Sequence, residues 1–111
     1  MPNKMRPIHP GEILREELAE LGLSASALAQ ELGVPANRIT GILNEERAIS
    51  ADTAHRLAKF FRTTPLFWLH LQVAYEARVL ELNKERASEY RKIHGGRWAG
   101  ADGKFGPSRA D

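Results

Sequence analysis

The stretch from Leu23 to Asn44, LSASALAQELGVPANRITGILN, decides the fold of this chain. Its hydrophobic residues recur every three to four positions, which is the spacing of one face of an α-helix. Gly33 divides the pattern, because glycine readily ends a helix in a left-handed conformation. We therefore predict two short helices, over residues 24–33 and 35–45, joined by a glycine turn. This arrangement is typical of a helix-turn-helix, which places its second helix in the DNA major groove.

Three more helices are expected around this pair, which gives an all-α domain of five helices. The first runs from residue 10 to residue 21, because Pro10 suits a first helical position. Ser50 is a favourable N-cap for a fourth helix, whose inward residues are Ala54, Leu57, Ala58 and Phe61. Thr64 and Pro65 open the longest helix, which reaches residue 82 and can extend to residue 90.

Composition narrows the class of protein further. The chain has 111 residues, no cysteine and a net charge of +2. We predict an N-terminal arm over 1–9, one domain over 10–82, and a helix extension with a flexible basic tail over 83–111. The tail carries the charge excess, with seven basic and four acidic residues over 84–111. The polar start lacks a secretion signal and no long apolar run is present, so we expect a cytoplasmic protein without a membrane span.

The predicted helix over 35–45 has an inward and an outward side. Ile39, Ile42 and Leu43 share the apolar side, whereas the opposite side carries Asn37, Gly41 and Asn44, flanked by Arg38 and Thr40. Asparagine can pair with adenine, arginine with guanine, and threonine with base edges or a thymine methyl. Gly41 would permit close approach to DNA, or would instead relieve a crowded helix crossing.

Phosphate contacts are expected from residues near helix ends. Ser24 and Ser26 begin the first helix of the pair, where free N–H groups attract anions. Asn44 ends the second helix and Arg47 follows it. Two plainer interpretations remain: Ser24 only caps its own helix, and Arg47 is a solvated charge in a turn.

The helix over 65–82 is apolar on two sides. Trp68, Leu71, Tyr75, Val79 and Leu82 form one stripe, which we expect to face the core. The other side consists of four aliphatic residues, which we expect to form a dimer interface: Leu66, Leu69, Val73 and Leu80. The alternative is that both sides pack within one chain.

Catalytic and metal chemistry is not supported by the sequence. The four histidines, at 9, 55, 70 and 94, are scattered and lack the spacing of metal ligands. No Ser/His/Asp set or phosphate-binding glycine loop is evident. We therefore expect no enzyme activity, cofactor or metal.

With these residues in place, the chain resembles the HigA (VapI-type) antitoxins, within the Xre or lambda-repressor-like helix-turn-helix group. The resemblance covers about residues 7–82. It includes HPGEILREEL at 9–18, LAQELGV at 28–34, RITGILNEERAISADTAHRLAKFF at 38–61, and TTPLFWLHLQVAYE at 63–76. In the last segment, Trp68 and Gln72 match a typical Trp-x-x-x-Gln helix. The tail from Asn83 onward has no matching pattern.

The resemblance implies a five-helix homodimer that binds a palindromic operator upstream of its own genes. It also implies a partner, a HigB-like toxin similar to ribosome-dependent mRNA endonucleases. By position, the bases would be faced by Ala36, Asn37, Arg38, Thr40 and Gly41, and the phosphates by Ser24, Asn44 and Arg47. Two alternatives stay open: a stand-alone Xre-type regulator without a toxin, and a partner-sequestering protein that does not bind DNA.

Overall fold

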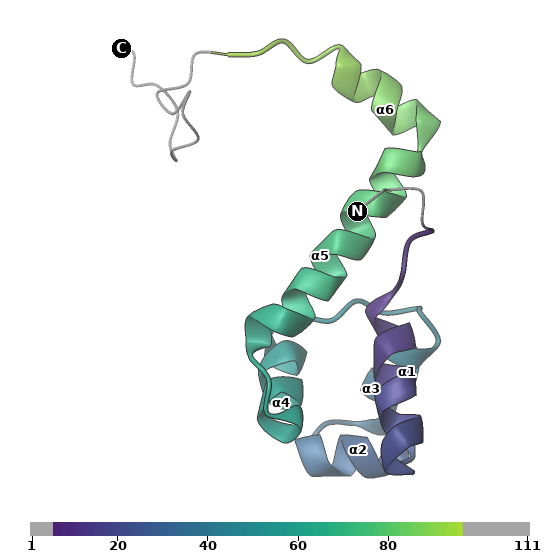
Figure 1. The fold of residues 1–111 in the computed structure, drawn as a ribbon, viewed down its shortest axis with the longest axis vertical. Coiled ribbons are helices and arrows are strands. Elements are labelled where there is room, and N and C mark those ends of the chain that lie inside the picture. Colours follow the sequence, from purple (N-terminus) through teal and green to yellow (C-terminus); the bar gives the residue numbers. More distant parts are fainter. Residues whose placement is uncertain (1–5, 97–111) are drawn as a thin grey trace. The chain divides into compact units, whose positions relative to one another are not determined.

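The computed structural model describes residues 6–96, and the regular secondary structure in that range is entirely α-helical (Figure 1). The all-α prediction is therefore confirmed for these residues. Residues 6–96 form six helices where five were expected: α1 Pro10–Leu21, α2 Ala25–Leu32, α3 Ala36–Leu43, α4 Ala51–Phe61, α5 Pro65–Leu82 and α6 Lys84–Arg91. Of the tail predicted over 83–111, residues 97–111 lie outside the described residues.

The sixth helix corrects the prediction that α5 can continue to residue 90. Asn83 adopts an extended conformation, with φ −83° and ψ 107°, and its side chain accepts a hydrogen bond from the Arg86 N–H at 3.0 Å. Asparagine is among the best N-cap residues because its side chain satisfies a free N–H at a helix start. The helix therefore stops at Leu82, and α6 begins afresh at Lys84.

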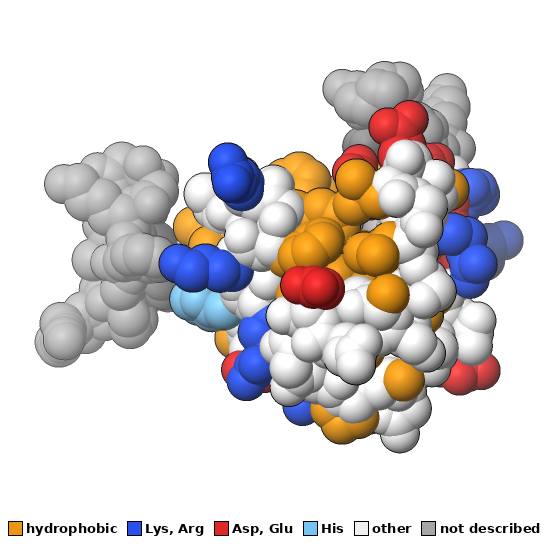
Figure 2. Space-filling view, turned by 90° about the horizontal axis from the view of Figure 1, so that it is seen from below, with side chains coloured by type: hydrophobic (Ala, Val, Ile, Leu, Met, Phe, Trp, Pro, Cys, Tyr) orange, Lys and Arg blue, Asp and Glu red, His pale blue; other side chains and the backbone are white. Residues whose placement is uncertain are grey.

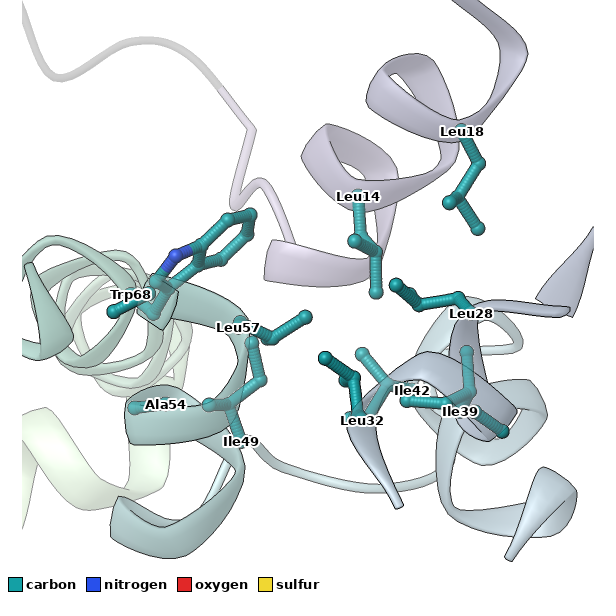
Figure 3. Close-up of a cluster of buried hydrophobic side chains, with 12 residues drawn as sticks. Leu14, Leu18, Leu28, Leu32, Ile39, Ile42, Ile49, Ala54, Leu57 and Trp68 are labelled. Carbon is teal, nitrogen blue, oxygen red and sulfur yellow. The ribbon is translucent and has the colours of Figure 1, made fainter. Parts of the chain in front are cut away.

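The described residues divide into two compact units, with the boundary between Leu80 and Glu81. The first unit contains one hydrophobic core to which α1–α5 all contribute (Figure 3). Helix α2 packs against α3 and α4, and α1 packs against α3. The fully or almost fully buried residues of this core include Leu14, Leu28, Ile39, Ile42, Leu57 and Trp68.

Side-chain caps fix several helix starts. Ser24 Oγ accepts the Ala27 N–H at 3.0 Å, and Ser50 Oγ accepts the Thr53 N–H at 3.2 Å, as their residue types predicted. The N-cap of α1 is His9, which sequence reasoning did not assign. Its buried Nδ1 accepts the Gly11 N–H at 2.9 Å, and its ring packs edge-on against Tyr75.

Trp68 and Gln72 anchor α5 to the rest of the unit. Trp68 is 1% exposed, and its indole N–H donates to Thr63 Oγ1 at 2.8 Å. Gln72 Oε1 accepts the Ile49 N–H at 2.9 Å, which ties α5 to the segment between α3 and α4. These two residues are the Trp-x-x-x-Gln pair singled out in the sequence, and both have a structural role.

The expected core stripe of α5 needs correction at its C-terminal end. Val79 and Leu82 were expected in the core but are exposed, because core packing along α5 ends near Tyr75. Leu69 was expected at a dimer interface but packs partly against the core. No helix within residues 6–96 combines the length and hydrophobicity needed to cross a bilayer.

Candidate nucleic-acid interface

Helix α3 presents its polar side outward, as the spacing predicted. Ile39 and Ile42 are both 0% exposed and belong to the core. Ala36, Asn37 and Thr40 are exposed on the other side. This division arises because apolar side chains three residues apart lie on the same side of a helix, and their burial turns the remaining positions to solvent. The second helix of the pair therefore has a free polar surface.

The first turns of α3 and α2 are the places where backbone N–H groups could meet an anion. Pro35 precedes α3 and provides no side-chain cap. The Arg38 N–H donates to the Pro35 carbonyl at 3.0 Å, whereas the N–H groups of Ala36 and Asn37 come too early in the helix for a helical partner. At the start of α2, Ser24 uses its hydroxyl to cap its own helix, in agreement with the plainer interpretation of that residue. Ser26 is exposed in the same first turn. Phosphate contacts by these serines remain a prediction.

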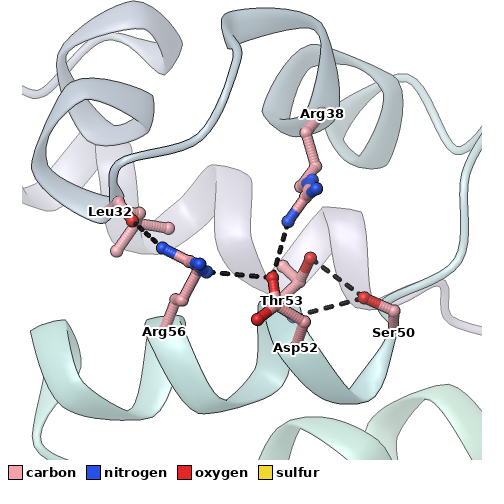
Figure 4. Close-up of polar contacts among 6 residues, drawn as sticks. All are labelled: Leu32, Arg38, Ser50, Asp52, Thr53 and Arg56. Atoms are coloured by element: carbon pink, nitrogen blue, oxygen red, sulfur yellow. Dashed lines mark hydrogen bonds and ion pairs between the residues drawn. The ribbon is translucent and has the colours of Figure 1, made fainter.

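Arg38 occupies a different setting from the other predicted base-facing residues. Its guanidinium lies 2.7 Å from Asp52 Oδ2 on α4, and its side chain is 30% exposed. Arg56 pairs with the same carboxylate oxygen at 2.9 Å and donates to the Leu32 carbonyl at 2.8 Å (Figure 4). The hydrogen bonds from Arg56 and then Arg38 hold the pKa of Asp52 below its usual value.

This Arg38–Asp52–Arg56 network connects α3, α4 and the end of α2. Asp52 and Arg56 are four residues apart on α4, a spacing that predicts a helical ion pair. Sequence reasoning did not single them out, and the contact with Arg38 cannot be predicted from local spacing. The consequence is that the orientation of α3 is supported on its outer flank as well as through the core.

Helix α1 supports the opposite end of α3. Gly11 is buried against the carbonyl oxygen of Ile42, which occupies the space a Cβ at position 11 would need. Arg15 donates to the Leu43 carbonyl at 2.8 Å, and so satisfies one of the unpaired carbonyls at the end of α3. Just before α1, Arg6 forms an ion pair with Glu12 at 2.7 Å, which lowers the pKa of Glu12 mainly through their hydrogen bond.

Gly41 is partly buried, because the side chain of Arg47 lies across it. A Cβ placed at position 41 would be 3.3 Å from Arg47 Cβ. The sequence offered two explanations for this glycine: close approach to DNA or a crowded helix crossing. The structure places a side chain from the following turn there instead of another helix. Asn44 and Arg47 are both exposed beyond the end of α3.

Hydrophobic side chains also remain exposed on the first unit. On α5, Leu66 and Val73 are each 60% exposed and Leu80 is 40% exposed. A shallow hollow of about 120 Å³ lies between α1 and the α4–α5 junction, with Ile13, Glu17, Phe61, Thr63, Phe67 and Trp68 around it. Figure 2, which views the protein from below relative to Figure 1, shows a group of hydrophobic side chains at the surface. No cluster of His, Asp or Glu suited to a metal ion occurs within residues 6–96.

Comparison with known proteins places this geometry in a class. A helix-turn-helix family profile matches residues 14–69. The Virulence-associated protein I of Dichelobacter nodosus is 50% identical over 84 residues, which cover 75% of this chain and 78% of that protein. The relatives found are helix-turn-helix regulators and antitoxins rather than enzymes, in agreement with the expectation from the sequence.

Two solved structures show a similar fold. An addiction-module antidote protein of the HigA family from Coxiella burnetii is 54% identical, with a TM-score of 0.77, and covers 83% of this chain and 100% of its own. The Pseudomonas aeruginosa antitoxin HigA, solved with the higBA promoter, is 44% identical with a TM-score of 0.72, covering 80% of this chain and 97% of its own. The chain therefore belongs to the helix-turn-helix family of DNA-binding proteins, in the group of HigA and VapI-type antitoxins.

Proposed function

We propose that this protein binds the operator of its own operon as a homodimer and represses transcription. The observation that carries the proposal is the exposed polar side of α3, held outward by the complete burial of Ile39 and Ile42. It is supported by the similarity to an antitoxin solved together with promoter DNA.

On this proposal, Asn37 and Thr40 read base edges in the major groove, and Ala36 contacts a thymine methyl. Arg38 supports the reading helix through its ion pair with Asp52. Ser26, Asn44 and Arg47 contact phosphates, together with the N–H groups at the start of α2 that Ser24 partly caps. Phosphate contacts make the affinity depend on salt, because each contact releases counterions from the DNA.

Two-fold assembly would come from the exposed side of α5. Leu66, Val73 and Leu80 are the exposed aliphatic residues of the predicted interface, and Leu69 is partly buried against the core. Apolar surface of this kind is typically covered by a partner. A dimer would place two copies of α3 on half-sites about one helical turn apart, which is the geometry of palindromic operators.

The test is fluorescence anisotropy with a labelled duplex from the region upstream of the protein's own gene. We expect tight binding that weakens with rising salt, and much weaker binding to a shuffled duplex of equal composition. Equal affinity for both duplexes would contradict sequence-specific recognition. Absence of binding to either duplex would favour the partner-sequestering alternative.

We further propose that the protein neutralises a HigB-like mRNA endonuclease toxin. The similarity to HigA-family antidote and antitoxin proteins supports this proposal. The test is co-expression with the small open reading frame adjacent to its gene, followed by co-purification and an mRNA-cleavage assay. We expect a stable complex in which cleavage is suppressed. If the protein encoded by the adjacent reading frame neither binds this protein nor cleaves mRNA, the stand-alone regulator is the better description.

A further inference from the structure

The side chain of Arg47 lies over Gly41, in the last turn of α3. An ideal Cβ at Gly41 would lie 3.3 Å from Arg47 Cβ and 3.7 Å from both Cδ and Nε. The aliphatic part of the arginine therefore runs across the surface that Gly41 leaves open. Gly41 follows Asn37 by four residues and precedes Asn44 by three, so all three share the outward side of the helix.

The turn after α3 brings Arg47 back to this position. The Glu45 N–H donates to the Ile42 carbonyl at 3.0 Å, and the Glu46 N–H donates to the Gly41 carbonyl at 2.8 Å. Glu45 has a φ of 63°, the left-handed conformation that reverses the chain at a helix end. The residues that follow are thereby directed back along the last turn of α3.

Arg47 also differs from the arginines around it in its bonding. Arg38 is paired with Asp52, and Arg15 is bonded to the Leu43 carbonyl. Within residues 6–96, the exposed guanidinium of Arg47 has no hydrogen bond or ion pair with the chain. Its fork of N–H donors and permanent charge suit a phosphate group, which binds arginine through two parallel hydrogen bonds.

We propose that Gly41 is a positioning residue for Arg47, and that the two act as one unit in DNA binding. Because Gly41 has no side chain, the aliphatic stem of Arg47 can pack directly on the helix at this position; we call this packing site the seat of Arg47. The seat holds the guanidinium at the edge of α3, where a phosphate of the bound duplex would lie. This inference rests on the proposed DNA binding and adds a role for Gly41 that involves no base contact.

The seat predicts opposite effects of Gly41→Ala on folding and on binding. Alanine is a better helix former than glycine, so the helix itself gains from the change. A methyl group 3.3 Å from Arg47 Cβ is a tight contact, and the arginine stem must shift to relieve it. The guanidinium is then displaced from its position at the edge of the helix.

The experiment is a double-mutant cycle with the upstream duplex, measured by anisotropy at several salt concentrations. We expect Arg47→Ala to weaken binding about tenfold and to reduce the salt slope by about 1. Gly41→Ala should weaken binding about threefold when Arg47 is present, and should have no effect in the Arg47→Ala background. Urea unfolding should give Gly41→Ala a midpoint equal to or above that of the unmodified protein.

A matched control is Lys59→Ala, which removes one exposed positive charge from α4. We expect its affinity to stay within about twofold of the unmodified protein, since a single rim charge has a small effect. Two results would contradict the positioning role of Gly41 while leaving the proposed function intact. One is an equal loss of duplex affinity from Gly41→Ala with and without Arg47, and the other is a lowered urea midpoint for Gly41→Ala. Failure of the unmodified protein to bind any duplex would overturn both proposals.

Discussion

Helices α3 and α5 both contribute to the core, but they expose opposite kinds of surface. Helix α3 buries Ile39 and Ile42 and exposes asparagine, threonine and alanine. Helix α5 buries Trp68 and Gln72 and exposes Leu66, Val73 and Leu80. A small polar surface suits the donors and acceptors of DNA base edges, whereas an exposed aliphatic surface suits another protein surface. Under the proposed function, recognition by α3 and assembly through α5 would therefore be separated between the two helices.

The largest effect is expected from removing Trp68, the buried side chain that anchors α5. We expect Trp68→Ala to lower the free energy of unfolding by about 3–5 kcal/mol, because it leaves a cavity in the core. Urea unfolding measures the loss. Trp68→Phe should have a smaller effect, since it retains one aromatic ring and loses only part of the buried volume, together with the indole N–H bonded to Thr63.

Introducing a charged residue on the exposed side of α5 tests whether this side forms the dimer interface. If it forms the dimer interface, Val73→Glu should yield a monomer in light scattering at micromolar concentration, because a buried unpaired carboxylate is costly. We expect operator affinity to fall at least about 100-fold when the two-fold assembly is lost, since each tenfold corresponds to about 1.4 kcal/mol. Ala74→Glu, an exposed residue to one side of that surface, is the matched control and should remain dimeric. A dimeric Val73→Glu protein would place the interface elsewhere.

The polar side of α3 is tested by truncating one amide. Asn37→Ala should weaken operator binding by about 1–3 kcal/mol and relax the preference at one base pair, if this asparagine reads a base edge. Binding to a panel of single-base operator variants measures the preference. Gln30→Ala removes an exposed amide from α2 and is the control. A loss that is the same for every operator variant would show that Asn37 contacts only the DNA backbone.

The ends of α2 and α3 allow a sharper comparison of stability. Helix α2 ends at Gly33 with a φ of 73°, whereas the turn after α3 places Glu45 at a φ of 63°. Glycine adopts this conformation without the steric penalty of a Cβ. We expect Glu45→Gly to raise the free energy of unfolding by about 0.5–1 kcal/mol, measured by urea unfolding. A lower stability would mean that the Glu45 side chain stabilises the turn more than its conformation strains it.

The smallest expected effect concerns the Arg38–Asp52 contact. If Arg38 supports α3 rather than reading a base, Arg38→Ala and Asp52→Asn should each weaken operator binding about two- to fivefold without changing base preference, because exposed ion pairs contribute little. Relaxed preference at one base in Arg38→Ala alone would identify Arg38 as a base reader. The lowered pKa of Asp52 means that its contribution to stability is present above the usual carboxyl pKa and is lost as pH falls through the lowered value.

Much of the fold could be predicted because its signals are local. The bounds of α1 and the Ser24 and Ser50 caps follow from residue types at helix ends. The inward side of α3 follows from the spacing of Ile39 and Ile42. The end of α5 at residue 82 was predicted, but the possible extension to residue 90 was wrong, because the local N-cap signal of Asn83 was not used.

What the amino-acid order determined by itself is therefore the set of helices and the sides on which they are apolar, since both depend on residues within a few positions of one another. Tertiary structure alone decided the contacts across the chain: Arg38 with Asp52, Gln72 with the Ile49 amide, and Leu69 against the core. These contacts join residues that are distant in sequence, so their geometry depends on how whole helices pack. The contact between Arg47 and Gly41 joins residues only six positions apart, yet it also depends on the left-handed turn at Glu45. The sequence gives no sign of this turn, because the residue in the left-handed conformation is not a glycine.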